Sequence, residues 1–233
     1  MSINNTIMTN QSLQRTARIA GVWYALLAIS GILGFLVFQP QVYVISDEVK
    51  TLRNLQDQLL IARVRLIFEI LIIITQALSA LWFYKLFKSI DEWSAWAVGI
   101  WGMVNAVVVM ISAIAMASSI DIAHAESMAH ETQLMQISLL NNLIKHAWQV
   151  GGLFFGLWLI PMGYIIIRSR RMPIWLGRFL VLGGLGYILN VILVYSGSEF
   201  VLLDAMVIPA TIGEFWMIGY LFIYGIRPQS EEL

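Results

Sequence analysis

Six long apolar runs constrain the fold of this chain more than any other feature of its sequence. A helix rises 1.5 Å per residue, so about 20 apolar residues cross the roughly 30 Å hydrocarbon core of a bilayer. The runs extend over residues 18–38, 64–86, 95–118, 147–167, 176–196 and 206–226. Only 12% of the residues are charged, about half the share in soluble domains. The sequence therefore predicts an all-α, polytopic membrane protein with six transmembrane helices, and the lipid bilayer is its first partner.

The distribution of basic residues predicts the orientation, because cytoplasmic loops retain lysine and arginine. One side has nine of them: Arg15, Arg18, Lys85, Lys88, Arg168, Arg170, Arg171, Arg178 and Arg227. The other side has five: Lys50, Arg53, Arg63, Arg65 and Lys145. This asymmetry and the even number of spans both place the two termini in the cytoplasm. The expected organisation is an N-terminal cytoplasmic segment 1–17, a six-helix domain 18–226 and a cytoplasmic tail 227–233.

The two longer outer connections have apolar residues at helical spacing. In residues 48–63 these are Leu52, Leu55, Leu59 and Leu60, and in residues 131–146 they are Leu134, Ile137, Leu140, Leu143 and Ile144. Such stripes are typical of amphipathic helices. We expect two outer helical extensions, each continuous with the span that follows it. The order of outer helix, span, short basic loop and span then occurs twice, as a weak internal repeat over residues 48–118 and 131–196.

Several classes of chemistry lack their characteristic residues in this sequence. The formal net charge is zero, which gives no basis for nucleic-acid binding. The chain has no cysteine, which excludes disulfides, cysteine nucleophiles and thiolate metal sites. The three histidines, His124, His130 and His146, lack a compact ligand spacing. We therefore expect no metal, no cofactor and no catalytic residue that the sequence can identify.

Two carboxylates lie inside the predicted spans, where an ionisable residue costs about 2.5–3.5 kcal/mol on insertion scales. Glu69 follows Arg65 by four residues, a spacing that allows an ion pair near the outer end of the second span. Glu214 is deeper, about eight residues into the sixth span, and its own helix contains no opposite charge. Each carboxylate has two interpretations, a structural partner in helix packing or a member of a functional polar site.

Further polar residues suggest a shared cavity. The set is Glu214, Asn105, Asn190, Gln76, Glu69, Arg65 and His146. Their alternative role is to join helices by hydrogen bonds, each contributing about 0.6–2 kcal/mol. Glu214 and Asn105 should lie at nearly the same depth, roughly 12 and 15 Å from opposite ends of their spans. We therefore expect Glu214 to face the bundle interior and to bind Asn105, directly or through water.

Four stretches resemble a known family of bacterial membrane proteins, called domain of unknown function 4386. They are Ala17-Arg-Ile-Ala-Gly-Val-Trp-Tyr24, residues 151–168 (GGLFFGLWLIPMGYIIIR), residues 172–187 (MPIWLGRFLVLGGLGY), and Ile212-Gly-Glu-Phe-Trp216 with the ending Tyr-Gly-Ile-Arg227. Pro161 departs from the family pattern and bears on the straightness of the fourth helix. The resemblance implies a six-span protein of the bacterial inner membrane, of unknown activity. It implies no catalytic residue, cofactor or substrate.

Three hypotheses for function remain open at this point. The first is a non-enzymatic protein that binds or moves a small or lipid-like molecule through an outward-facing polar cavity. The second is a regulatory or assembly protein whose glycine-rich helix faces contact another membrane protein. The third is an intramembrane enzyme that uses Glu214 with His146. A cavity would favour the first, an exposed glycine face the second, and a histidine within hydrogen-bonding reach of a carboxylate the third.

Overall fold

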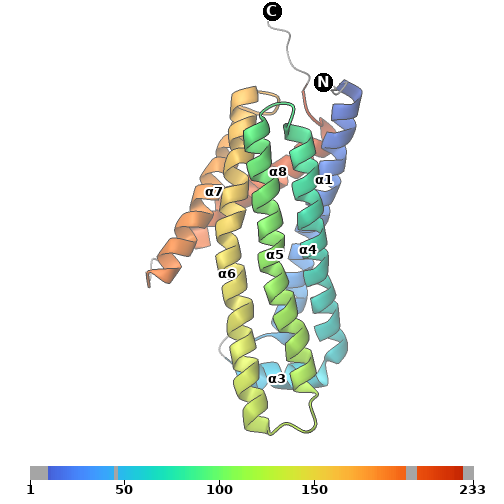
Figure 1. Cartoon of the computed structure of the whole chain (residues 1–233), viewed down its shortest axis with the longest axis vertical. Coiled ribbons are helices and arrows are strands. Elements are labelled where there is room, and N and C mark those ends of the chain that lie inside the picture. Colours follow the sequence, from blue (N-terminus) through green and yellow to red (C-terminus); the bar gives the residue numbers. More distant parts are fainter. Residues whose placement is uncertain (1–9, 45–46, 198–203, 228–233) are drawn as a thin grey trace, which may run out of the picture. The chain divides into compact units, whose positions relative to one another are not determined.

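The computed structural model describes residues 10–44, 47–197 and 204–227, and every regular element in these residues is a helix (Figure 1). Six helices are long and apolar enough to cross a membrane: Asn10–Val42, Leu59–Phe87, Glu92–Ala123, His130–Ser169, Ile174–Tyr195 and Ala205–Ile223. The predicted all-α fold with six spans is confirmed, and the chain is a multi-pass membrane protein.

The first four spans extend beyond the apolar runs that predicted them at both ends, whereas the sixth ends at Ile223, three residues before its run does. In chain order the helices are α1 (Asn10–Ile32), the π-helix η1 (Leu33–Phe38), α2 (Gln39–Val42), α3 (Glu48–Asp57), α4 (Leu59–Phe87), α5 (Glu92–Ala123), α6 (His130–Ser169), α7 (Ile174–Tyr195), the 3₁₀-helix η2 (Asp204–Val207) and α8 (Ile208–Ile223). In the first four spans, backbone hydrogen bonding continues through polar residues at the helix ends, so there the apolar run underestimates the helix length.

The two predicted extensions differ in their connection to the following span. The second is continuous, because α6 runs unbroken from His130 through Pro161 to Ser169. The expectation of continuity was wrong for the first. At Gln58 the backbone has φ −123° and ψ 43°, outside the helical region, so α3 ends there and α4 begins at the next residue. In Figure 1, α3 runs crosswise to α4, α5 and α6.

The chain divides into two compact units. The first unit comprises Met1–Ala25, Ala77–Met103 and Gly152–Leu233, and the second comprises Leu26–Gln76 and Val104–Gly151. The helices α1, α4, α5 and α6 therefore each contribute a segment to both units.

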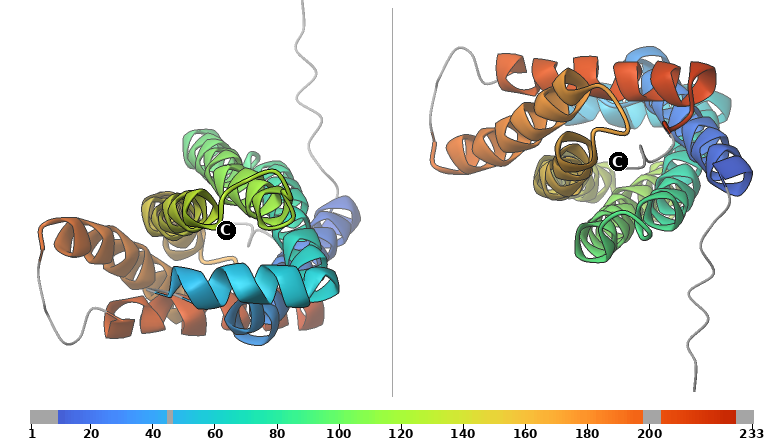
Figure 2. Two further views of the ribbon diagram at one scale, coloured as in Figure 1. Left: turned by 90° about the horizontal axis from the view of Figure 1, so that it is seen from below. Right: turned by 90° about the horizontal axis from the view of Figure 1, so that it is seen from above.

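The first unit has an aromatic core and close helix contacts at glycine. The ring of Tyr24 lies 5.2 Å from that of Phe83 and 5.4 Å from that of Trp158, both in edge-on arrangements. A Cβ atom on Gly184 of α7 would lie 2.8 Å from the backbone oxygen of Gly156 on α6. The adjacent helices α7 and α8 lie side by side (Figure 2). Small residues thus allow these helix backbones to approach closely, as in many membrane bundles.

The second unit has an aliphatic core that includes the amphipathic face of α3. Leu52 and Leu55 are buried there, together with Met116 of α5 and Ile137 of α6. The predicted stripes were only partly buried. Leu60 and Leu143 are exposed, because the break at Gln58 and the helical period direct them away from this core.

Candidate functional site

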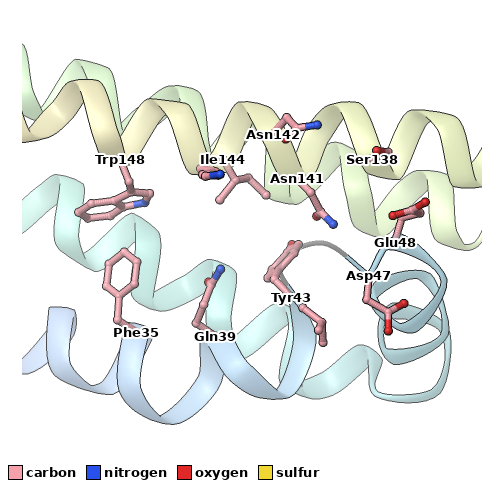
Figure 3. A pocket seen from close by; sticks show the side chains of 12 residues that line it. Phe35, Gln39, Tyr43, Asp47, Glu48, Ser138, Asn141, Asn142, Ile144 and Trp148 are labelled. Carbon is pink, nitrogen blue, oxygen red and sulfur yellow. The ribbon is translucent and has the colours of Figure 1, made fainter. Parts of the chain in front are cut away.

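A pocket of about 310 Å³ lies within the second unit (Figure 3). Its walls come from the segment after α1, from the start of α3 and from one face of α6. The lining residues are Phe35, Gln39, Tyr43, Val44, Asp47, Glu48, Ser138, Asn141, Asn142, Ile144, Lys145 and Trp148. On α6 they recur every three or four residues, so a single helix face forms one wall.

One end of the pocket is aromatic. The rings of Phe35 and Trp148 meet edge to face, with 4.3 Å between their centroids. Phe35 belongs to the π-helix η1, whose wider turn also includes Gly34. A Cβ atom at Gly34 would lie 3.4 Å from Nη1 of Arg65, at van der Waals contact, so this turn packs directly beside the arginine. The π-helix thus brings the aromatic end of the pocket against a buried cation.

A fully buried ion pair lies next to the aromatic end. Nη2 of Arg65 is 2.9 Å from Oε2 of Glu69, and both side chains are 0% exposed. The i,i+4 pair that this spacing allows is therefore present, and it is buried from solvent. The guanidinium carbon also lies 4.9 Å from the centroid of the Phe35 ring, a distance at which a cation and a ring attract each other.

Two pocket residues hydrogen-bond to this ion pair. Nε of Arg65 donates to Oε1 of Gln39 at 2.7 Å. Nε1 of Trp148 donates to Oε1 of Glu69 at 2.8 Å. Because Gln39 uses its oxygen on Arg65, its amide nitrogen points toward the pocket (Figure 3). Hydrogen bonds thus join both Arg65 and Glu69 to the pocket wall.

The ion pair also retains unused hydrogen-bonding capacity. Nη1 and Nη2 of Arg65 and Oε2 of Glu69 make no well-aligned hydrogen bond among the described residues. The 2.9 Å contact is therefore an electrostatic one with poor hydrogen-bond alignment. Buried polar atoms without a partner are costly and commonly bind water or a ligand group.

The opposite end of the pocket is acidic. Oδ1 of Asp47 accepts a 2.8 Å hydrogen bond from the backbone nitrogen of Lys50 and so caps α3. Glu48 is the first residue of that helix. Figure 3 shows both carboxylates at the end of the pocket away from Phe35 and Trp148. A positively charged group would be attracted to this end by Coulomb forces.

The other predicted site residues of the second unit do not line the pocket. Gln76 and Asn105 are fully buried, whereas His146 is exposed on α6. A Cβ atom on Gly151 would lie 3.3 Å from Oδ1 of Asn105, so this amide faces α6. Neither Nδ2 nor Oδ1 of Asn105 has a hydrogen-bond partner among the described residues.

In the first unit, Glu214 of α8 accepts a 2.7 Å hydrogen bond from the hydroxyl of Tyr24 on α1. Sequence reasoning missed this donor. Asn190 lies half-buried on α7 in the same unit. The expected contact between Glu214 and Asn105 stays a prediction, because the two residues belong to different units.

Sequence reasoning identified Arg65 and Glu69 but missed most of the pocket. Gln39 and Trp148, which bind them, are distant in sequence, and a polar glutamine next to Pro40 at a helix end is not distinctive. Asp47 resembles an ordinary helix cap. A usable signal lies in Asn141, Asn142 and Lys145, polar residues within the apolar stripe of residues 131–146 that line the pocket.

An uncharacterized protein of Archaeoglobus fulgidus is 38% identical over 48 residues, which cover 21% of this chain and 30% of that protein. The chain thus matches under a third of the length of that relative. No solved structure matches the chain significantly. The family described as Domain of unknown function (DUF4386) matches residues 19–225, nearly the whole chain. The resemblance seen in the sequence is confirmed, and the chain belongs to the DUF4386 family.

Proposed function

We propose that this membrane protein binds a small amphipathic molecule in the pocket of its second unit, without chemical conversion. The observation that carries the proposal is the pocket itself, about 310 Å³ in volume, at the lower end of the usual range for ligand sites. Its aromatic end suits an apolar group, and its other end contains charged and amide groups. The buried pair of Arg65 and Glu69 supports the wall through Gln39 and Trp148.

The proposed location is the bacterial inner membrane, with both termini in the cytoplasm. The nine-to-five bias of basic residues and the even number of spans support this orientation. In this topology the connection containing Asp47 and Glu48 is on the outer side. The pocket would then receive its ligand from the periplasm or from the outer leaflet.

A comparison of two tryptophan variants tests the proposal. Ser138 lines the pocket, while its neighbour Leu139 is 68% exposed. Wild type, Ser138→Trp and Leu139→Trp would be purified in native lipid discs and their bound small molecules identified by mass spectrometry. We expect one compound in wild type and in Leu139→Trp that is lost from Ser138→Trp, because the indole fills the pocket. Equal retention in all three, or no enriched compound in wild type, would contradict the proposal.

The alternative roles have less support. Gly156, Gly183 and Gly184 pack against neighbouring helices within the first unit, so an assembly role would need a different surface. The enzyme hypothesis pairs His146 with Glu214, which belong to different units, so their contact stays a prediction. Within the described residues no group of three histidine or carboxylate side chains is placed to hold a metal ion.

A further inference from the structure

The acidic end of the pocket contains hydrogen-bond acceptors that have no donor. The carboxylate of Glu48 makes no hydrogen bond or ion pair with any described residue. Oδ1 of Asn141 is buried and lacks a partner among the described residues. Asp47 uses Oδ1 to cap α3, which leaves Oδ2 for another donor. Three side chains therefore offer acceptors around one end of the pocket, and a ligand that supplies several donors would satisfy them.

The charges of the lining also favour a cation. Asp47 and Glu48 contribute two negative charges, and Lys145 contributes one positive charge. The opposite charges of Arg65 and Glu69, 2.9 Å apart, cancel, so this pair next to the pocket adds no net charge. The lining is thus net negative. An anionic ligand would meet uncompensated carboxylates, whereas a cationic ligand would neutralise the excess.

The aromatic lining is compatible with a cationic ligand. Tyr43 and Trp148 both line the pocket, and aromatic faces attract cations as well as apolar groups. Phe35 already has the guanidinium of Arg65 near its ring, so its remaining surface is available mainly for apolar contact. A ligand that spans the pocket would place its charge near Asp47 and Glu48 and its apolar body against Phe35 and Trp148 (Figure 3).

We infer that the pocket selects a primary amine in its ammonium form, attached to a compact apolar body. The inference rests on the proposed function and specifies its ligand class. The ammonium group has three donors, which match the acceptors of Glu48, Asn141 and Asp47. Asp47 is exposed and Glu48 half-buried, so a neutral or anionic analogue of the same shape would leave these carboxylates to water, without a compensating charge, and would bind more weakly.

Three compounds of similar size test the inference: 2-phenylethylamine, 2-phenylethanol and phenylacetate. Their binding to the purified full chain in discs of neutral lipid would be measured by calorimetry, with empty discs subtracted. We expect the amine to bind about tenfold or more tightly than the alcohol, as for the loss of one charge-assisted hydrogen bond. Phenylacetate should bind most weakly of the three, because the carboxylates repel it.

Variants identify the groups responsible for the selectivity. The double variant Asp47→Asn/Glu48→Gln should lose about tenfold in amine affinity and keep its affinity for the alcohol. Asparagine still caps α3, so the fold is retained. Asp57→Asn is the matched control, because this carboxylate is on the same helix and 63% exposed. It should leave amine affinity unchanged.

The outcomes separate the two proposals. If the alcohol and the acid bind as tightly as the amine, and Ser138→Trp abolishes all binding, the pocket binds ligands but the ammonium assignment is wrong. The assignment is also overturned if Asp47→Asn/Glu48→Gln retains the full preference for the amine. If wild type binds none of the three compounds, the ammonium assignment fails, and the proposed function is decided by the mass-spectrometry comparison of wild type, Ser138→Trp and Leu139→Trp.

Discussion

Trp148 and Glu69 connect the pocket to the interior of the second unit by a single hydrogen bond. The indole nitrogen of Trp148 donates to Oε1 of Glu69 at 2.8 Å, and the same indole meets the ring of Phe35 in the pocket wall. Glu69 in turn lies 2.9 Å from Arg65, with no exposed surface on either side chain. A change in the pocket wall is therefore transmitted directly to a buried charge.

Replacing Trp148 with phenylalanine should destabilise the protein by about 1–3 kcal/mol, because one oxygen of Glu69 loses its donor in a buried site. Thermal unfolding in detergent measures this as a lower Tm. Trp93→Phe is the control, since Trp93 is 84% exposed and its replacement should leave Tm unchanged. Equal Tm values for Trp148→Phe and wild type would mean that the hydrogen bond contributes nothing.

Replacing one partner of the buried ion pair should lower the free energy of unfolding more than replacing both partners does. Arg65→Met leaves the Glu69 carboxylate uncompensated, and we expect a loss of about 3–5 kcal/mol. Arg65→Met combined with Glu69→Leu removes both charges and should recover most of that loss. The yield of folded protein and its Tm, measured for both variants, provide the check. A double variant no more stable than the single one would show that the uncompensated carboxylate is not the cause of the loss.

The contact between α7 and α8 should be sensitive to one added methyl group. A Cβ atom on Gly183 would overlap the backbone of Ala210, whereas one on Gly31 of α1 would meet nothing within 4 Å. Gly183→Ala should therefore lower stability by about 1–3 kcal/mol through overpacking. Gly31→Ala should leave stability unchanged or raise it, because alanine favours the helix. Resistance to thermal aggregation in lipid discs distinguishes the two.

Tyr24 and Glu214 should respond differently to conservative replacement. Tyr24→Phe removes the donor of the 2.7 Å hydrogen bond and should cost about 1 kcal/mol or more. Glu214→Gln retains an acceptor oxygen, so its Tm should stay near that of wild type. If Glu214→Gln is the more damaging of the two, the carboxylate has a further charged or protonated role. Unfolding curves for both variants decide between these outcomes.

The predicted topology can be tested without purification. A reporter that is active only in the periplasm, fused after Leu233, should be silent if the C-terminus is cytoplasmic. The same reporter inserted after Ala125, between the third and fourth spans, should be active. Activity of the C-terminal fusion would reverse the proposed orientation and place the pocket on the cytoplasmic side.

Much of the fold follows from the sequence because lipid requires long apolar helices. Runs of about 20 apolar residues can be read directly from the order of residues in the chain. The pair of Arg65 and Glu69 was equally predictable from the sequence, since both residues are on one helix at i,i+4 spacing. The rest of the site was not. Gln39 and Trp148 meet this pair only through tertiary packing, and no local pattern relates them to it. Glu214 likewise binds Tyr24, a hydroxyl about 190 residues away in the chain.

The π-helix at Leu33–Phe38 also affects how the first span can be interpreted. A π-turn accommodates one residue more than an α-turn, and each residue of an α-helix advances it by about 100°. A helical wheel drawn through residues 10–42 is therefore correct before Leu33 and rotated by one position after Phe38. Gln39 and Val42 lie on the rotated side. Deletion of one residue other than Phe35 from this segment should therefore convert the π-turn into an α-turn and leave Gln39 facing the pocket, whereas the same deletion elsewhere in the first helix would rotate the residues that follow by about 100°.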